Sequence, residues 1–160
     1  MLDGIHKIHL IGIGGSGMRA IANILIQKGY DVSGSDIAES AVISKFRDMG
    51  ATVHIGHNKE YVNGVDAIVR STAIREDNPE IVAAKEQGIT ILHRSDIVKA
   101  VLDVTDGIAV AGAHGKTSTT SMIGQILVEA NADPTVIIGG EVDYLKGSSC
   151  LGKGHFSVVE

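Results

Sequence analysis

The stretch 7-KIHLIGIGGSGMRAIANILIQKG-29 joins an apolar run, a glycine-rich turn and a segment with helical spacing. Residues 7–13 have the apolar character of a buried β-strand. In the segment 17–29 the apolar side chains fall on one helical face: Met18, Ile21, Ala22, Leu25 and Ile26. Gly29 is suited to end that helix. The stretch therefore predicts one strand–loop–helix unit, the building block of a parallel α/β sheet.

Further units of the same kind follow. The remaining apolar runs predict strands at 31–36, 51–56, 66–71, 89–94, 107–112, 135–140 and 156–160. Helical segments are expected at 40–50, 80–88, 96–103 and 116–130, with start signals at Ser40, Pro79 and Ser95. Repeated strand–helix–strand units with right-handed crossovers predict an α/β fold, a Rossmann-like, doubly wound parallel sheet with helices on both faces. The polar stretch 102-LDVTDG-107 is the best boundary, because a new strand–loop–helix unit begins there.

Composition and charge exclude several classes of function. The formal net charge of −5 argues against a protein that binds the phosphate backbone of nucleic acids. The lack of Trp and the 3% aromatic content argue against base-stacking platforms. A single cysteine, Cys150, cannot form an internal disulfide and fits a reducing compartment. The apolar run 8–13 is too short to span a membrane, so we expect a cytoplasmic protein without membrane contact.

The first glycine-rich turn has the pattern G-x-G-x-x-G, formed by Gly12, Gly14, Gly15, Ser16 and Gly17 between a strand and a helix. Glycines let backbone N–H groups approach a diphosphate, and the helix N-terminus adds partial positive charge there. Asp36 follows after the roughly twenty residues at which dinucleotide enzymes place an acid for ribose hydroxyls. Taken alone, this half of the chain suggests an NAD(P)-dependent oxidoreductase. The alternative is that the glycines only allow close packing of helix on strand.

A second loop, 112-GAHGKT-117, lies between the strand expected at 107–112 and a long helix. It is shorter than the usual G-x-x-x-x-G-K-[ST] loop, which would need a glycine at Val110. The working groups are nevertheless present, because Lys116 can reach β/γ-phosphates and the Thr117 hydroxyl can ligate Mg²⁺. The alternative is a glycine-rich turn with a solvated lysine. Two such loops suggest two phosphorylated ligands, a nucleotide-linked substrate and a nucleoside triphosphate.

At these residues the chain resembles the Mur ligase family. The motifs that carry the resemblance are IHLIGIGGSGM (8–18), GSDI (34–37), STAI (71–74), DNP (77–79), HRSDI (93–97), AVAGAHGKTSTTSMI (109–123) and IIGG (137–140). The resemblance implies an ATP-dependent ligase of peptidoglycan synthesis, and hence of cell wall biogenesis, cell shape and cell division. It is strongest to members that join L-alanine to UDP-N-acetylmuramate through an acyl phosphate. A member that joins a tripeptide to the same sugar nucleotide is the nearest alternative.

The resemblance also implies roles for individual residues. Lys116 and Thr117 are the expected catalytic residues, within an ATP loop of Gly112, Ala113, His114, Gly115, Lys116, Thr117 and Ser118. Thr117 and Glu160 are the expected Mg²⁺ ligands. The UDP-sugar residues are expected to be Gly12, Gly14, Gly15, Ser16, Gly17, Met18, Asp36, Ser71, Thr72, Ala73, His93 and Arg94. Arg70 and Thr72 depart from the smaller or more serine-like residues of many relatives, which puts side-chain contacts there in doubt.

Four other histidines are assigned no ligand role. His6, His9 and His54 are expected to be buried or surface side chains on strands rather than metal ligands, because no Cys or acid accompanies them at ligand spacing. His57 is expected in a loop.

The resemblance implies that residues 1–103 form a UDP-N-acetylmuramate-binding domain and residues 104–160 only the opening of an ATP-binding domain. The third, amino-acid-binding domain would be absent. We therefore expect a truncated piece that binds the UDP-sugar without ligase activity and self-associates through exposed apolar surface. A stand-alone UDP-sugar-binding module with a vestigial ATP loop is an alternative. All of these interpretations require open space for a diphosphate at the beginning of the first helix.

Overall fold

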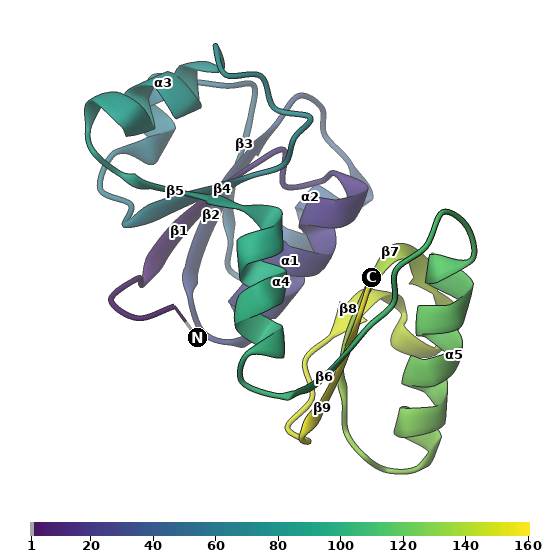
Figure 1. Cartoon of the computed structure of the whole chain (residues 1–160). Coiled ribbons are helices and arrows are strands. Elements are labelled where there is room, and N and C mark those ends of the chain that lie inside the picture. Colours follow the sequence, from purple (N-terminus) through teal and green to yellow (C-terminus); the bar gives the residue numbers. More distant parts are fainter. Residues whose placement is uncertain (1) are drawn as a thin grey trace.

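The computed structural model describes residues 2–160 and contains two β-sheets that follow one another along the chain (Figure 1). The first sheet has five parallel strands in the order β3-β2-β1-β4-β5. The second has four strands in the order β6-β9-β7-β8. The polar stretch 102–107 joins the two sheets, since α4 ends at Leu102 and β6 begins at Asp106.

The elements of the first sheet and its helices are β1 (Lys7–Ile11), α1 (Ser16–Gln27), β2 (Asp31–Asp36), α2 (Ala41–Asp48), β3 (Thr52–Ile55), the 3₁₀ helix η1 (Lys59–Val62), β4 (Ala67–Arg70), α3 (Pro79–Glu86), β5 (Thr90–His93) and α4 (Arg94–Leu102). Those that follow are β6 (Asp106–Ala109), α5 (Lys116–Glu129), β7 (Thr135–Val142), η2 (Asp143–Leu145), β8 (Gly147–Cys150) and β9 (Phe156–Val159). Every strand and helix expected from the sequence forms, with ends shifted by a few residues.

The parallel α/β fold with helices on both faces of the sheet is confirmed. Ile8 and Leu10 of β1 pack in one apolar cluster with side chains of α1, α2 and α4. Ile11 belongs to the opposite cluster, with side chains of α3 and η1. Figure 1 shows α3 on the far side of the sheet from α1, α2 and α4. The sheet is therefore buried on both sides, which explains the near-continuous apolar run in β1.

The structure departs from the sequence-based expectations at two places. β8 was not expected, and it pairs antiparallel with β7, so the second sheet is not wholly parallel. Its sequence, GSSC, has none of the β-branched or aromatic residues that signal a strand. The expected cap Ser95 is wrong: α4 begins at Arg94, and the His93 side chain caps it by accepting a hydrogen bond from the Ser95 N–H.

Helix α1 also contacts the second sheet. Asn23 donates to the Ser149 carbonyl oxygen at 3.1 Å, and the Ser149 hydroxyl donates to the Ala20 carbonyl oxygen at 3.2 Å. Ile137 and Val159, from the second sheet, belong to the same apolar cluster as the buried face of α1. One core therefore extends from the first sheet through α1 into the second.

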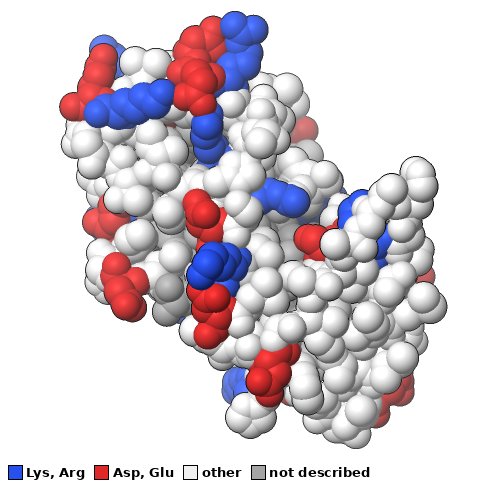
Figure 2. Space-filling model, viewed as in Figure 1, with Lys and Arg blue, Asp and Glu red and all other residues white. Residues whose placement is uncertain are grey.

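The outer surface differs between the two parts of the chain. Ion pairs gather near α3, where Glu76 contacts both Arg70 and Lys85. Figure 2 shows few charged side chains over the part of the surface that α5 occupies. There Met122 and Ile126 are 59% and 66% exposed. The described helices include none with the length and apolar character required to cross a membrane.

Candidate functional site

The first glycine-rich loop turns the chain from β1 into α1. Gly12 has φ +74°, a left-handed conformation that favours glycine. The N–H groups of Gly12 and Ile13 both donate to the Ser35 carbonyl oxygen, at 2.8 and 3.1 Å. Gly15 is the N-cap of α1 and supplies no side-chain cap, so the first-turn N–H groups of Ser16 and Gly17 have no partner within residues 2–160. Such a helix beginning is an anion-binding feature.

Asp36, at the end of β2, holds this loop from the side. Its Oδ2 accepts a hydrogen bond from the Gly14 N–H at 2.8 Å, and its Oδ1 accepts one from the Ile37 N–H at 2.8 Å. A Cβ at Gly14 would lie 2.9 Å from Oδ2, so a larger residue there would push the carboxylate away from the loop. The carboxylate thus fixes the loop, and a contact of Asp36 with the uridine end of a ligand stays a prediction.

A pocket of about 670 Å³ opens at the beginning of α1. The expected UDP-sugar residues that line it are Gly12, Gly14, Gly15, Ser16, Gly17, Met18, Asp36, Ser71, Thr72, Ala73 and Arg94. His93 is not among the lining residues and serves instead as the cap of α4. The pocket supplies the open space that a diphosphate at this helix would need. A separate pocket of about 420 Å³ lies between α1, α2 and the β7–β8 hairpin, away from both glycine loops.

Arg94 brings a positive charge to the pocket from the first residue of α4. Its guanidinium lies so close to Gly17 that a Cβ there would collide with Nη1. The helix beginning and the guanidinium are both favourable for negative charge. The geometry at this end of the pocket therefore fits a phosphate group.

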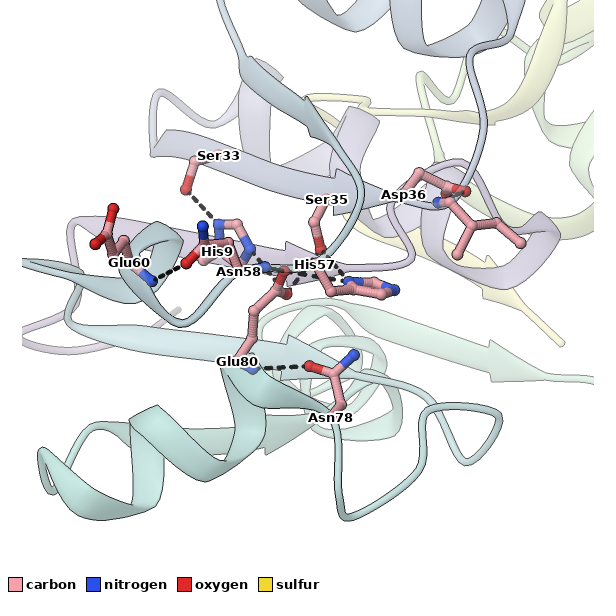
Figure 3. A network of polar contacts seen from close by, with 10 residues as sticks. His9, Ser33, Ser35, Asp36, His57, Asn58, Glu60, Asn78 and Glu80 are labelled. Atoms are coloured by element: carbon pink, nitrogen blue, oxygen red, sulfur yellow. Dashed lines mark hydrogen bonds and ion pairs between the residues drawn. The ribbon is translucent and has the colours of Figure 1, made fainter.

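His57, which the sequence placed in a loop without a role, also lines the pocket. Its Nδ1 lies 3.1 Å from Glu80 Oε1 and 3.1 Å from the Ser35 hydroxyl (Figure 3). Glu80 is fully buried at the start of α3, and its Oε2 accepts a hydrogen bond from Ser35 at 2.7 Å and contacts His9 Nε2 at 3.3 Å. The Asn58 N–H completes the set by donating to Oε1 at 3.2 Å.

The Glu80 carboxylate is stabilised as an anion despite its burial. Burial by itself raises the pKa of Glu80, but hydrogen bonds from His9 and Ser35 outweigh it, and the pKa lies below its usual value. The first turn of α3 adds the favourable field of a helix N-terminus. The His57 ring is thus anchored to a buried negative charge at the wall of the pocket.

The remaining histidines outside the loops lie apart from the pocket. The His9 Nδ1 contacts the Ser33 hydroxyl at 2.9 Å inside the core. The His54 ring stacks on Tyr61 with centroids 4.0 Å apart. The His6 N–H donates to Asp66 at 2.8 Å.

The second loop connects β6 to α5 and is open to solvent. Gly115 has φ +78° and precedes the first residue of α5. The Lys116 ammonium donates to the Gly112 carbonyl oxygen at 2.8 Å, so the side chain folds over its own loop. Ala113, His114 and the loop glycines are exposed, whereas Ser118 lies in the first turn of the helix. The arrangement offers backbone N–H groups and one ammonium to an anion.

Glu160, Thr117 and Gly139 meet beside this loop. Glu160 Oε1 accepts hydrogen bonds from the Thr117 hydroxyl at 3.1 Å and from the Gly139 N–H. Glu160 Oε2 is buried and has no hydrogen-bond partner within residues 2–160. A hydroxyl and a carboxylate with an unused oxygen are ligands that Mg²⁺ accepts, together with phosphate oxygens. The donor set therefore fits the divalent cation expected from the sequence.

Comparison with known proteins relates the chain to one family, both by sequence and by structure. The model of the Mur ligase family, catalytic domain, matches residues 7–104. The chain is 45% identical over 160 residues to the UDP-N-acetylmuramate–L-alanine ligase of Solidesulfovibrio magneticus, covering 100% of the chain and 35% of that protein. It is 47% identical over 155 residues to the protein of that name in Chlorobaculum tepidum, covering 96% of the chain and 33% of the relative. The chain thus spans about a third of the length of these curated relatives.

Two solved structures are similar over nearly the whole chain. The UDP-N-acetylmuramate-alanine ligase of Thermotoga maritima matches with a TM-score of 0.89 and 35% identity, over 96% of this chain and 36% of that one. The UDP-N-acetylmuramate:L-alanyl-gamma-D-glutamyl-meso-diaminopimelate ligase of Neisseria meningitides matches with a TM-score of 0.89 and 26% identity, over 98% of this chain and 52% of that one.

Proposed function

Because the chain belongs to the Mur ligase family, we propose that it carries the sugar-nucleotide site and ATP loop of a UDP-N-acetylmuramate–L-alanine ligase. Residues 1–103 form the UDP-N-acetylmuramate-binding domain in this proposal, and residues 104–160 the first part of the ATP-binding domain. The site of action is the cytoplasm, where the product enters peptidoglycan synthesis.

The single observation that carries the proposal is the pair of strand–loop–helix junctions. The first opens into a pocket of about 670 Å³, and the second places Thr117 beside Glu160, with Lys116 folded over the loop. Within residues 2–160 the N–H groups of the first two residues of α1 and of α5 have no partner, so each junction can offer them to an anion. An enzyme that joins a sugar nucleotide to an amino acid with ATP needs both.

The reaction in this proposal has two steps. A carboxylate oxygen of the lactyl group attacks the γ-phosphorus of ATP, and ADP leaves. The amine of L-alanine then attacks the carbonyl carbon of the acyl phosphate, inorganic phosphate leaves, and the nitrogen loses a proton. Lys116 contacts the β/γ-phosphates and offsets charge on the transferring group, with the N–H groups of residues 112–118 around it. His114 positions the loop.

Thr117 and Glu160 hold Mg²⁺ in this proposal, through the hydroxyl and the unused Oε2. The ion supplies positive charge next to the phosphate oxygens. At the other site Gly14–Met18 and Arg94 hold the diphosphate. Asp36 lies toward the uridine, and the loop 71–73 toward the rest of the ligand.

The tripeptide-adding ligase is the weaker candidate. Both solved ligases match the chain with a TM-score of 0.89, but the alanine ligase is 35% identical and the tripeptide ligase 26%. The curated alanine ligases reach 45–47%. An NAD(P)-dependent oxidoreductase, which the first loop alone suggested, is set aside because the family match spans that loop.

Calorimetric titration of the chain tests the proposal. We expect binding of UDP-N-acetylmuramate and no binding of NADH. Gly14→Ala should weaken sugar-nucleotide binding, because its Cβ would displace the Asp36 carboxylate from the loop. Gly147→Ala is the matched control, since a Cβ there meets no atom within 4 Å. Binding of NADH without UDP-N-acetylmuramate contradicts the proposal.

A second titration, with ATP and Mg²⁺, addresses the ATP loop. Binding that requires Mg²⁺ and is weakened by Glu160→Gln supports a working loop. Sugar-nucleotide binding without any ATP binding would favour the stand-alone module with a vestigial second loop.

A further inference from the structure

A chain of buried polar side chains runs from the core of the first sheet to the wall of the pocket (Figure 3). It begins at Ser33 and His9, passes through Glu80, and ends at His57. His9, Ser35 and Glu80 are fully buried, whereas His57 is partly exposed. The proposed ligation uses none of these side chains, and maintaining so many polar groups in a core is costly unless all are paired.

The hydrogen bonds determine which nitrogen of His57 carries a proton. The Ser35 hydroxyl donates its hydrogen bond to Glu80 Oε2, at 2.7 Å. Towards the His57 Nδ1, 3.1 Å away, both Ser35 and Glu80 Oε1 therefore present only acceptor lone pairs. Nδ1 must be the donor. The neutral ring then carries its proton on Nδ1 and leaves Nε2 with a lone pair.

Nε2 is the ring nitrogen of His57 that makes no hydrogen bond within residues 2–160, because the hydrogen bonds of His57 there all involve Nδ1. Figure 3 shows the other ring nitrogen on the side of the ring away from Glu80. His57 itself lines the pocket together with Asp36. A ligand group that meets Nε2 in the neutral ring must supply the hydrogen.

The sheet order indicates which half of a ligand lies there. His57 follows β3, and Asp36 ends β2, on the β3-β2 side of the central loop after β1. The segment 71–74 follows β4, on the opposite side. In related sheets the acid at the end of the second strand faces the nucleoside ribose. His57 is therefore on the nucleoside side of a diphosphate held at the loop.

We propose that His57 is a specificity residue for the nucleoside half of the ligand, and that Glu80 positions it by fixing Nδ1 as the protonated nitrogen. Nε2 then accepts a hydrogen bond from the base or the ribose. This proposal rests on the proposed sugar-nucleotide function of the pocket. Its tautomer component concerns the ligand-free chain and can be tested independently.

The first test is ¹⁵N NMR of the histidine rings in the ligand-free chain at neutral to mildly alkaline pH. We expect His57, assigned by the signal lost in His57→Phe, to have a protonated Nδ1 and a bare Nε2. This is the less common tautomer of free histidine, so the fold must select it. Glu80→Gln removes the charge at nearly constant volume and should shift His57 toward the Nε2–H form. A wild-type ring with its proton mainly on Nε2 overturns the proposal.

The second test is binding of UDP and CDP. His57→Phe keeps the ring size and removes the acceptor, and it should weaken UDP binding roughly fivefold to tenfold, the effect of one hydrogen bond. His54→Phe is the matched control, because His54 stacks on Tyr61 and does not line the pocket. It should bind UDP as the wild type does. His57→Gln, whose amide can donate to Glu80 and present its oxygen to the ligand, should recover part of the loss.

CDP identifies the donor, because cytosine lacks the N3–H of uracil and has the same ribose. Loss of UDP binding alone in His57→Phe assigns the contact to the base, and equal loss for both assigns it to a ribose hydroxyl. Either result supports the proposal. Unchanged UDP affinity in His57→Phe overturns the ligand contact. A wild-type chain that binds neither nucleotide contradicts the proposed function and the ligand contact together, while the tautomer measurement still decides the role of Glu80.

Discussion

The two glycine loops begin helices in similar ways but are supported very differently. The first is held by Asp36 and Ser35 from β2, and its helix α1 has six buried side chains. The second is exposed, and its helix α5 buries only Thr120 and Gly124. Lys116 contacts its own loop rather than a neighbouring element. The first site is therefore part of the core, whereas the second site relies on a helix with few tertiary contacts.

This contrast separates function from stability. At the first loop, Asp36 would lie next to the ligand and also fixes the loop to the sheet, so a substitution there should change both ligand affinity and stability. At the second, side chains with a proposed chemical role carry little of the folding free energy. Four substitution experiments test this difference.

The largest expected effect compares the two helices directly. Ile21 in α1 is fully buried, and Ile21→Ala should lower the free energy of unfolding by about 2–5 kcal/mol. Ile126 in α5 is 66% exposed, and Ile126→Ala should change it by less than about 0.5 kcal/mol. Urea unfolding monitored by circular dichroism measures both. Similar losses for the two variants would show that α5 is buried in solution, for example by the self-association expected from the sequence.

The next effect concerns Lys116. Lys116→Met removes the ammonium from the phosphates and should weaken binding of MgATP about 100-fold, as expected for charge-assisted hydrogen bonds. Stability and UDP affinity should not change, because in the described part of the chain the Lys116 ammonium bonds only the Gly112 carbonyl oxygen. Lys28→Met, at the end of α1, serves as the control. A loss of thermal stability in Lys116→Met would contradict the separation of function from folding at this loop.

Substitution of Asp36 should have a smaller effect, but on both UDP affinity and stability. Asp36→Asn keeps the shape of the side chain but turns an acceptor into a donor next to the N–H groups of Gly14 or Ile37. We expect UDP affinity to fall about tenfold, accompanied by a lower melting temperature. Asp31→Asn, at the exposed opposite end of β2, should leave both unchanged. A normal melting temperature in Asp36→Asn would argue that the carboxylate serves the ligand alone.

The smallest effect is a pH dependence. The pKa of Glu80 is lower in the folded chain, so its ionised form stabilises the fold above the ordinary carboxyl pKa of about 4.3, and that stability is lost as pH falls through the folded value. In Glu80→Gln this contribution is missing at every pH. The difference in unfolding free energy between wild type and variant should therefore narrow below about pH 4. A constant difference from pH 7 to pH 3 would mean that Glu80 does not titrate with folding.

The sequence predicted those parts of the fold whose signals are local. The apolar run of β1, the Ser40 cap and Pro79 at the beginning of α3 all act within a few residues, and all three form as expected. The strand β8 has no such signal, because Gly147–Cys150 becomes a strand through pairing with β7. His93 competes with Ser95 for the same helix beginning, and spacing alone does not decide between them.

The pocket was predictable where one loop builds it and hidden where distant segments meet. The glycines of residues 12–17 signal their own conformation. His57 and Glu80 are 23 residues apart and meet only because α3 folds back over the sheet. In the sequence His9 is an ordinary polar residue within an apolar strand. Only the structure shows that it lies on the same face of β1 as Ile11, where Glu80 contacts it. The only clue in the sequence was Glu80 itself, next to Pro79. An acid in the first turn of a helix is usually interpreted as solvated, whereas the structure buries this one.

Helix α1 is shared by both halves of the chain, and this has a practical consequence for anyone who wishes to dissect the molecule. A cut in the stretch 102–107 would remove Ile137, Val159 and Ser149 from their partners on α1. The shorter product would then expose an apolar face of α1 to water, and the Asn23 amide would lose its hydrogen bond to Ser149. Recombinant preparation of residues 1–103 alone therefore calls for polar substitutions on that face of α1. The alternative is to co-express residues 104–160 as a separate chain that packs against it.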